Sequence, residues 1–425
     1  MLYQELKERG LVYQETSEEL NKTLSQPLTF YCGFDPTSDS LHIGSLLPLI
    51  TMRRLQLAGH KPIVLLGGAT GMIGDPSGKS KERVLLTKEI IDRNAKGIQK
   101  NAERIIDFSG PNAAVLVNNM DWMESYSYVN FLRDIGKYFS INYMLGKDSV
   151  KTRIENRDQG ISYTEFSYML LQSYDFYYLM QKYNCRMQIG ASDQWGNITA
   201  GVELIRRIQG DDQNKDHVYG LTFPLITKSD GSKFGKSEGG NIWLNPDKTS
   251  PYQFYQFFLR LPDADVLKLL RFMSLKSLEE IQGIEEAFKK EPHKLEAQLA
   301  LARELTVLIH GESELKRVEN ASQALFSGDI QSLDETTLKE VFSETPSLKA
   351  PKSSTSQKTL VDLLVESQLC SSKGAARKDI KAGAIYVNNQ RFEGEDAVAN
   401  QLPLLFGSLL ILRKGKKNYC LVQFS

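Results

Sequence analysis

Residues 28–66 read LTFYCGFDPTSDSLHIGSLLPLITMRRLQLAGHKPIVLL, and this stretch decides the fold. The apolar run at 28–34 is rich in β-forming residues and predicts a strand, which turn residues follow at 35–40. A helical pattern over 44–58 stops at Gly59, and a second apolar strand is predicted at 62–66. Strand, helix and strand at this spacing make a βαβ unit. Such a unit implies an α/β fold with a parallel sheet and a ligand crevice at the carboxyl ends of its strands.

The pattern changes further along the chain. From about 250 to 326 the strand signals end and apolar residues recur at helical spacing, which predicts an all-α region; the clearest series is Leu295, Leu299, Ala302, Leu305 and Ile309. Residues 345–358 (TPSLKAPKSSTSQK) hold two prolines, four serines and three lysines, with little to bury. This composition is typical of a linker, because such a segment cannot offset its ordering entropy.

The composition of the chain limits the classes of protein to which it can belong. The 425 residues hold 52 Lys+Arg and 52 Asp+Glu, so the net charge is zero. Residues 351–425 carry 11 basic against 6 acidic side chains, so a basic end (+5) follows an acidic-leaning body (−5). The cysteines are too few and too scattered for a disulfide framework or a zinc site; they are Cys32, Cys185, Cys370 and Cys420. We therefore expect reduced thiols, no bound metal, no membrane span and a cytoplasmic location.

Two glycine-rich stretches fail the standard nucleotide fingerprints. Residues 74–80 (GDPSGKS) have one residue too few between the glycines for a P-loop, and residues 67–71 (GGATG) do not supply G-x-G-x-x-G. Their glycines permit close backbone approach to a ligand but are equally consistent with plain tight turns.

Two other stretches favour a phosphate ligand. His42 and Gly44 stand where a predicted strand gives way to a helix, and a helix N-terminus attracts anions. Lys233 and Lys236 lie in a glycine- and serine-rich loop (KFGKS) that could close on a transferring phosphate. Taken alone, a histidine at a helix start is more often a cap or surface residue, and a glycine- and lysine-rich loop is more often a solvated turn.

The predicted helix 164–183 carries a polar stripe. Tyr168, Gln172 and Asp175 fall at i, i+4 and i+7, which places them on one helical face. That face is either solvent-exposed or buried against a polar ligand, because buried polar groups need partners. Residues 190–196 (GASDQWG) follow another short apolar strand, again at a predicted crevice edge.

In this order the motifs resemble the class I aminoacyl-tRNA synthetases, with a His-Ile-Gly signature followed by a lysine-rich loop. Within that class the chain is similar to the bacterial tyrosyl-tRNA synthetases over nearly its whole length. The resemblance rests on Tyr31 with Asp35-Pro-Thr37, on Gly74-Asp75-Pro-Ser-Gly-Lys79, on Tyr168-x-x-x-Gln172-x-x-Asp175 and on Ser192-Asp193-Gln194.

The resemblance implies an ATP-dependent tyrosine–tRNA ligase that forms tyrosyl-adenylate and pyrophosphate, then transfers tyrosine to the terminal adenosine of tRNA(Tyr). Magnesium would arrive with ATP. The implied tyrosine-binding residues are Tyr31, Asp75, Tyr168, Gln172, Asp175 and Gln194. The implied ATP-binding residues are Cys32, Asp35, His42, Gly44, Asp193 and Lys236, and those implied in catalysis are Thr37, His42, Lys79, Arg83, Lys233 and Lys236. Two departures from the family pattern are Ser45, where a second histidine is common, and Ala191, where a glycine is usual.

The resemblance also divides the chain. It implies a Rossmann-like catalytic domain with a connecting insert at 1–222, a helical domain with the KFGKS loop at 223–330, a linker at 331–357 and an S4-like RNA-binding domain at 358–425. It implies a homodimer, with an interface expected near residues 118–147. The implied tRNA-binding residues are Arg377, Lys378, Lys381, Arg413, Lys414, Lys416 and Lys417.

Three alternatives compete with this reading. A tryptophanyl enzyme would lack the tail and the pair formed by Tyr31 and Asp175. A non-catalytic RNA-binding protein derived from a synthetase would be expected to lose the ATP signatures. An RNA-modifying enzyme that shares only the tail module would not explain the residues before Pro351.

Overall fold

The structure is a computed structural model. It describes residues 2–78, 84–155, 160–210, 217–227, 229, 234–237, 240–327, 329–343, 345–394, 397–415 and 418–425. The chain forms two compact units, one of Met1–Lys248 with Phe258–Ile309 and one of Thr249–Phe257 with His310–Ser425. The boundary between them crosses α12 (Pro251–Leu259).

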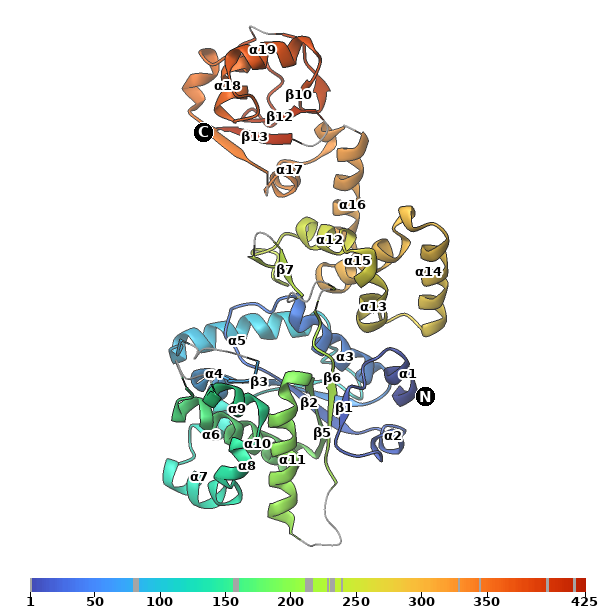
Figure 1. The fold of residues 1–425 in the computed structure, drawn as a ribbon, viewed down its shortest axis with the longest axis vertical. Helices are drawn as coiled ribbons and strands as arrows, with labels where there is room; N and C mark the ends of the chain where they lie inside the picture. Colours follow the sequence, from blue (N-terminus) through green and yellow to red (C-terminus); the bar gives the residue numbers. More distant parts are fainter. Residues whose placement is uncertain are drawn as a thin grey trace. The chain divides into compact units, whose positions relative to one another are not determined.

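A six-stranded sheet is the centre of the first unit (Figure 1), with strand order β1-β6-β5-β2-β3-β4. Its strands are β1 (Gln14–Glu15), β2 (Thr29–Phe34), β3 (Lys61–Leu66), β4 (Val115–Asn118), β5 (Cys185–Ala191) and β6 (Tyr219–Phe223). All pairings are parallel except that of β1 with β6. The chain leaves β2 through η1 (Ile43–Ser45) and α3 (Leu46–Leu57) to reach β3, which confirms the predicted βαβ unit.

The strand order changes direction at β2, which is paired in parallel with both β3 and β5. In open parallel sheets a ligand crevice forms at the carboxyl ends of the strands where the order reverses. The loops that follow β2 and β5 are therefore the place to look for a site.

Helices cover both faces of this sheet. Figure 1 shows α3 and α5 (Lys88–Glu103) on one side and α10 (Tyr163–Tyr183) and α11 (Trp195–Gln209) on the other, and these helices contact β3, β5 and β6. Phe176 and Leu179 of α10 are fully buried and pack with Ile63 of β3. Burial of each such side chain stabilises the fold by about 1.5–3 kcal/mol, so α10 is fixed against the sheet by its apolar face.

The remaining helices of the first unit surround this core. α1 (Leu2–Glu8) precedes β1, α2 (Leu20–Thr23) lies between β1 and β2, and α4 (Gly68–Ile73) follows β3. Between β4 and α10 the chain inserts α6 (Met120–Met123), α7 (Tyr128–Asp134), α8 (Ile141–Leu145) and α9 (Asp148–Glu155). After the short hairpin of β7 (Lys236–Ser237) and β8 (Gly240–Asn241) come α13 (Asp263–Met273), α14 (Leu278–Lys290) and α15 (Glu296–His310). The predicted all-α character of this later region is confirmed.

The second unit contains a five-stranded sheet with strand order β11-β10-β12-β13-β9. Its helices are α16 (Glu312–Ser327), α17 (Glu335–Val341), α18 (Leu360–Glu366) and α19 (Lys373–Lys381). Its strands are β9 (Ser347–Ala350), β10 (Ile385–Val387), β11 (Gln390–Arg391), β12 (Leu409–Lys414) and β13 (Asn418–Phe424). Apolar side chains of α18, α19 and the strands share one core, as expected of a small α+β module.

The predicted linker at 331–357 is wrong in two places, because it contains both α17 and β9. Residues 347–350 form β9, which pairs in parallel with β13 from Ser347 opposite Leu421 to Ala350 opposite Phe424. Backbone hydrogen bonds to β13 and burial of Ala350 order this segment in spite of its polar composition. The module therefore begins about ten residues before the predicted start.

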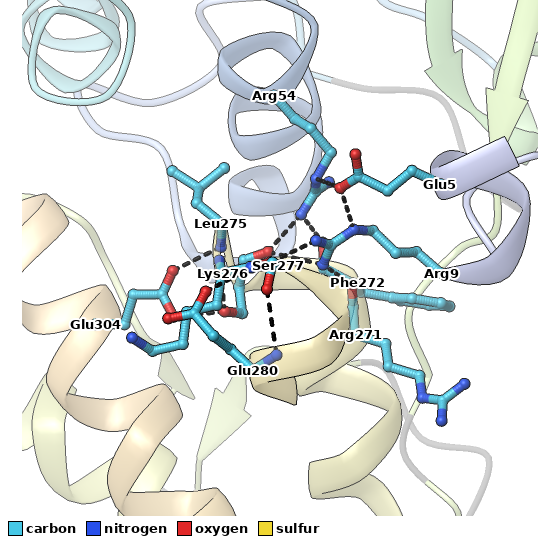
Figure 2. Close-up of polar contacts among 11 residues, drawn as sticks. Glu5, Arg9, Arg54, Arg271, Phe272, Leu275, Lys276, Ser277, Glu280 and Glu304 are labelled. Atoms are coloured by element: carbon cyan, nitrogen blue, oxygen red, sulfur yellow. Dashed lines mark hydrogen bonds and ion pairs between the residues drawn. The ribbon is translucent and has the colours of Figure 1, made fainter. Parts of the chain in front are cut away.

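Two buried arginines join the N-terminal part of the first unit to the end of α13 (Figure 2). Arg9 donates to the backbone oxygens of Arg271, Ser274 and Lys276, and its Nε donates to Glu5 at 2.8 Å. Arg54 of α3 donates to the oxygens of Phe272 and Ser274. The last carbonyls of a helix have no partner within the helix, so these guanidinium groups satisfy acceptors that would otherwise be buried unpaired.

We expect Arg9→Met to lower the free energy of unfolding by about 2–4 kcal/mol, because three buried carbonyls lose a charged donor. Urea denaturation measures this change. The control is Lys7→Met, two residues earlier in the last turn of α1, where the exposed side chain should change stability by less than about 0.5 kcal/mol. Equal effects of the two substitutions would show that the Arg9 contacts contribute nothing.

Candidate active site

A pocket of about 490 Å³ opens at the carboxyl ends of β2, β3 and β5. The loop after β2, the residues after β3, α10 and η3 (Ser192–Gln194) all contribute to its wall. The sequence predictions converge here, since the pocket is lined by Tyr31, Cys32, Asp35, Thr37, His42, Gly44, Asp75, Tyr168, Gln172, Asp175, Asp193 and Gln194. The structure thus brings together residues that the sequence spreads over more than 160 positions.

The polar stripe of α10 faces the protein interior. Tyr168 and Asp175 are 5% and 1% exposed, and Gln172 is partly buried at the same pocket. The alternative of a solvent-exposed stripe is wrong. Each of these groups must therefore find partners inside the protein or in a ligand.

Asp175 is a fully buried carboxylate held by two side-chain donors. Asn119 Nδ2 donates to Oδ2 at 3.0 Å, and Trp122 Nε1 donates to Oδ1 at 2.8 Å. Burial raises the pKa of Asp175 to about 8, although the two donors act in the opposite direction. Asn119 is itself fixed, because its Oδ1 accepts from the Ala69 amide at 2.7 Å.

Tyr31 lies on β2 beside this carboxylate and is completely buried. Its ring packs against Phe176 with 5.3 Å between ring centroids. Burial, and then the nearby charge of Asp175, raise the pKa of the Tyr31 phenol. Its hydroxyl has no hydrogen-bond partner among the described residues. A buried hydroxyl without a partner carries a free-energy cost that a polar ligand can remove.

A second set of bonds surrounds Asp35. Tyr168 donates its hydroxyl to Oδ2 at 2.8 Å, and Thr70 donates to Oδ1 at 2.7 Å. Burial, then the charge of Asp35, raise the pKa of Tyr168, so this phenol remains protonated. Gly67 must lack a side chain here, because a Cβ would lie 2.0 Å from Asp35 Oδ1. The GGATG stretch is therefore not a plain turn: Gly67 packs against Asp35, and the following residues begin α4.

A third set of bonds surrounds Asp75. Gln194 Nε2 donates to Oδ2 at 2.7 Å, and the Ser77 amide donates to Oδ1 at 2.9 Å. Gln172 Nε2 points to Gln194 Oε1 at 3.4 Å, and Asn197 Nδ2 reaches the same oxygen at 3.3 Å. These side chains come from four separate segments and fix the carboxylate at the pocket wall.

The charge of this pocket favours a cationic group. Besides Asp175, whose raised pKa of about 8 keeps it largely protonated at neutral pH, it is lined by the carboxyl groups of Asp35, Asp75 and Asp193, and no lysine or arginine among the described residues lines it. Within that same part of the chain, acidic, histidine and cysteine side chains form no group able to hold a metal ion. An ammonium group would find complementary charge here.

His42 begins η1 and caps it. Its Nδ1 accepts a hydrogen bond from the Gly44 amide at 3.0 Å, and a Cβ at Gly44 would lie 2.7 Å from the imidazole. Because Nδ1 accepts, the neutral ring carries its proton on Nε2, which makes Nε2 a donor. The cap interpretation and the binding interpretation of His42 are thus compatible.

Several predicted residues lie outside the described part of the chain. They are Lys79, Arg83, Lys233, Lys416 and Lys417. For Lys236 the structure describes only the backbone, as the first residue of β7.

Sequence reasoning missed several residues that shape this site: Thr70, Asn119, Trp122, Gln188 and Trp243. A signal existed for Asn119, because polar residues directly after an apolar strand mark a crevice edge. Gln188 lines the pocket from β5, and its buried Oε1 has no hydrogen-bond partner among the described residues.

The basic residues of the second unit differ in their surroundings. Arg377, Lys378 and Lys381 on α19 are exposed. Lys414 instead pairs with Asp379 at 2.7 Å. The guanidinium of Arg413 stacks 3.8 Å from the ring centroid of Tyr386. The α19 side chains are therefore more accessible to a partner.

Comparison with known proteins adds the family. Residues 22–327 match the family model described as tRNA synthetases class I (W and Y), and residues 337–422 match the tyrosine–tRNA ligase SYY-like C-terminal domain. The tyrosine–tRNA ligase of Staphylococcus epidermidis is 50% identical over 428 residues, covering 100% of this chain and 99% of that protein. The corresponding protein of Staphylococcus carnosus is 49% identical over the same shares. A C-terminally truncated mitochondrial tyrosyl-tRNA synthetase from Aspergillus nidulans superposes with a TM-score of 0.68 at 32% identity, covering 76% of this chain and 94% of that one.

We expect Asp175→Asn to alter how stability depends on pH. With a folded pKa of about 8 and an unfolded value of about 3.9, the folded chain binds a proton that the unfolded chain has released. The free energy of unfolding therefore falls as pH rises from about 4 to 8, by up to about 1.4 kcal/mol per pH unit. The variant lacks this contribution, so wild type should lose stability relative to it over that window.

Urea denaturation at several pH values between 5 and 8 measures the difference. The control is Asp134→Asn, because the Arg133 guanidinium lowers the pKa of that exposed carboxyl and keeps it ionised throughout. Parallel pH dependence of wild type and Asp175→Asn would contradict the raised pKa.

Proposed function

The chain belongs to the class I tRNA synthetases of the tryptophan and tyrosine group, and we propose that it activates L-tyrosine with ATP and transfers it to tRNA(Tyr). Tyrosine carboxylate attacks the α-phosphate of ATP, the bond to pyrophosphate breaks, and tyrosyl-adenylate forms. The terminal adenosine of tRNA then accepts the tyrosyl group and AMP leaves. The carboxylate is already a nucleophile, so positioning and charge stabilisation supply the rate.

The observation that carries the choice of tyrosine is the buried polar end of the pocket. The Tyr31 hydroxyl, which has no partner among the described residues, lies beside the Asp175 carboxyl. Apolar side chains surround both groups. A phenol hydroxyl can bond to both groups, whereas phenylalanine would leave the Tyr31 hydroxyl without a partner and offer Asp175 no bond beyond those of Asn119 and Trp122. A site built to bond a hydroxyl rejects the analogue that lacks it by about 10⁴–10⁵, and tyrosyl-tRNA synthetase is the standard example of this effect.

The other end of the amino acid meets the acidic wall. Asp75, fixed by Gln194, supports binding of the substrate ammonium together with Tyr168 and Gln172. Gln194 then lies near the reacting carboxylate. This orientation directs the carboxylate toward the loop that carries His42.

ATP, carrying its magnesium ion as part of the substrate, would occupy the remainder of the pocket. Cys32, Asp35, Thr37, His42, Gly44 and Asp193 line that part. Burial raises the pKa of the Cys32 thiol to about 12, so it acts as a neutral wall group. The departing pyrophosphate requires cations, and we assign this role to Lys79, Arg83, Lys233 and Lys236.

We further propose a homodimer formed through the insert between β4 and α10. Large apolar side chains on α7 and α8 are strongly exposed, and a cluster of this kind indicates an interaction surface; they are Tyr128, Val129, Leu132, Ile141 and Leu145. The same two helices bury Phe131 and Met144 in one shared core, so the exposed side chains belong to one rigid element.

In the second unit the exposed cations of α19 would meet tRNA phosphates, and this binding would be sensitive to salt. Among the described residues no helix is both long and apolar enough to cross a bilayer. We place the protein in the cytoplasm, where its tRNA and ATP substrates are found.

We expect the full chain to catalyse tyrosine-dependent exchange of labelled pyrophosphate into ATP in the absence of tRNA. The adenylate step needs only tyrosine and ATP, so the label should enter ATP as the reaction reverses. Filter assays of labelled ATP measure it, with tryptophan and phenylalanine as matched amino acids. Exchange that was absent with tyrosine, or equal with tryptophan, would rule out the proposed function.

Tyr31→Phe should weaken tyrosine binding without lowering the stability of the free protein. Removing a buried hydroxyl without a partner should leave the free protein as stable as wild type, or more stable by about 1 kcal/mol. The same change should weaken tyrosine binding about 5- to 10-fold and leave phenylalanine binding nearly unchanged. Calorimetric titration with both amino acids measures this. An unchanged ratio of the two affinities would place the phenol elsewhere.

Combining Arg377→Gln with Lys378→Gln should weaken tRNA binding and therefore tRNA charging. Each phosphate contact that is lost should reduce the slope of log K for tRNA binding against log salt concentration by about 1. Pyrophosphate exchange should stay at the wild-type level, because the adenylate step uses the first unit alone. The matched control is Lys414→Gln, whose ammonium already pairs with Asp379. If charging were unaffected at moderate salt, α19 would not be part of the tRNA contact.

A further inference from the structure

The turn that carries His42 is joined by backbone hydrogen bonds to the segment that follows the lysine loop. The Ile43 amide donates to the Ile242 oxygen at 2.9 Å, and the Leu244 amide donates to the Leu41 oxygen at 2.8 Å. These bonds set Trp243 directly opposite His42 in an isolated antiparallel bridge. Both segments belong to the first unit.

The lysine loop itself reaches the same turn. The Ile242 amide donates to the Gly235 oxygen at 3.0 Å. Gly235 has φ +99°, and a Cβ there would lie 3.1 Å from Ile43 Cγ1. Residue 235 must therefore be small and conformationally free, because it passes close to the helix start that His42 caps.

Trp243 also contacts His42 through its side chain. The indole and imidazole rings meet edge to face, with 6.0 Å between centroids and 72° between planes. Lys248 Nζ lies 4.7 Å from the centroid of the indole ring and forms an ion pair with Asp39, three residues before His42. This pair lowers the pKa of Asp39, so its carboxylate stays ionised at neutral pH. Trp243 is thus fixed by Lys248 and Asp39 where it meets His42.

We propose that Trp243 is a positioning residue for the adenylate step and acts through His42. This rests on the proposed function. The Gly44 amide bonds one nitrogen of the imidazole, and the indole of Trp243 packs against the ring itself. This packing sets the tilt of the ring and holds Nε2 toward the part of the pocket assigned to ATP. A donor stabilises a transition state only if it is already in place, so the indole contributes to rate without touching the phosphates.

The test is a double-mutant cycle in the full chain, measured by pyrophosphate exchange. Trp243→Ala should lower kcat about 10-fold, the scale of one aromatic contact, and leave the KM for tyrosine within about 2-fold. Trp243→Phe, which keeps an aromatic ring, should recover most of that loss. In a His42→Asn background, Trp243→Ala should cost less than about 2-fold, because the group through which it acts is gone.

A second pair of variants does not alter Trp243. Lys248→Met should lower kcat about 2- to 5-fold by removing the cation over the indole. Its control is Lys294→Met, which breaks an exposed ion pair with Glu291 and should leave kcat unchanged. Thermal melting and tyrosine titration show whether each variant is folded.

The proposal is overturned if the effects of Trp243→Ala and His42→Asn multiply, if phenylalanine gives no recovery, or if the two lysine variants behave alike. Any of these results, with normal exchange by the wild type, leaves the proposed function intact. Absence of tyrosine-dependent exchange in the wild type would instead remove the proposed function, and the role of Trp243 with it.

Discussion

The arrangement of the site depends on one buried carboxyl group. Asp175 is shielded from water because the apolar face of its helix, α10, packs against the sheet. The protein must therefore supply hydrogen-bond donors in place of solvent. Asn119 and Trp122 provide them from the start of α6, directly after β4, and Asn119 also donates to Thr70, which follows β3. Removing Asp175 from water thus fixes the relative positions of the polar groups at the closed end of the pocket.

The burial of these polar groups explains why the free protein is already selective for tyrosine over phenylalanine. The Tyr31 hydroxyl is held beside Asp175 without a partner, so the free-energy cost of the polar pocket is present before any substrate arrives. A phenol removes that cost and an unsubstituted ring does not. The acidic wall around Asp75 adds the second requirement, which is an ammonium group at the opposite end of the same ligand.

The sequence was sufficient for those parts of the fold and site that follow from local patterns. Strand and helix periodicity predicted the βαβ unit, and i, i+4, i+7 spacing placed Tyr168, Gln172 and Asp175 on one face. The roles of Asn119 and Trp122 could not be predicted in this way, because their contacts depend on how separate loops meet in space. The predicted linker failed for a related reason. Pairing with β13 orders β9, and composition does not report pairing.

The charge distribution assigns different chemistry to the two units. The acidic-leaning body contains the carboxyl-lined pocket, and the basic C-terminal residues present exposed cations on α19. Lys414 and Arg413 show that not every cation there is available, since both are engaged within the module. A sequence count alone does not distinguish the two groups.

The central claim is that the polar closed end of the pocket selects a phenol. Isothermal titration of the full chain with L-tyrosine and with L-phenylalanine, in the absence of ATP and tRNA, tests it most directly. The account predicts that tyrosine binds at least about 10³-fold more tightly, because phenylalanine leaves buried polar groups unpaired. Equal affinities for the two amino acids would contradict it.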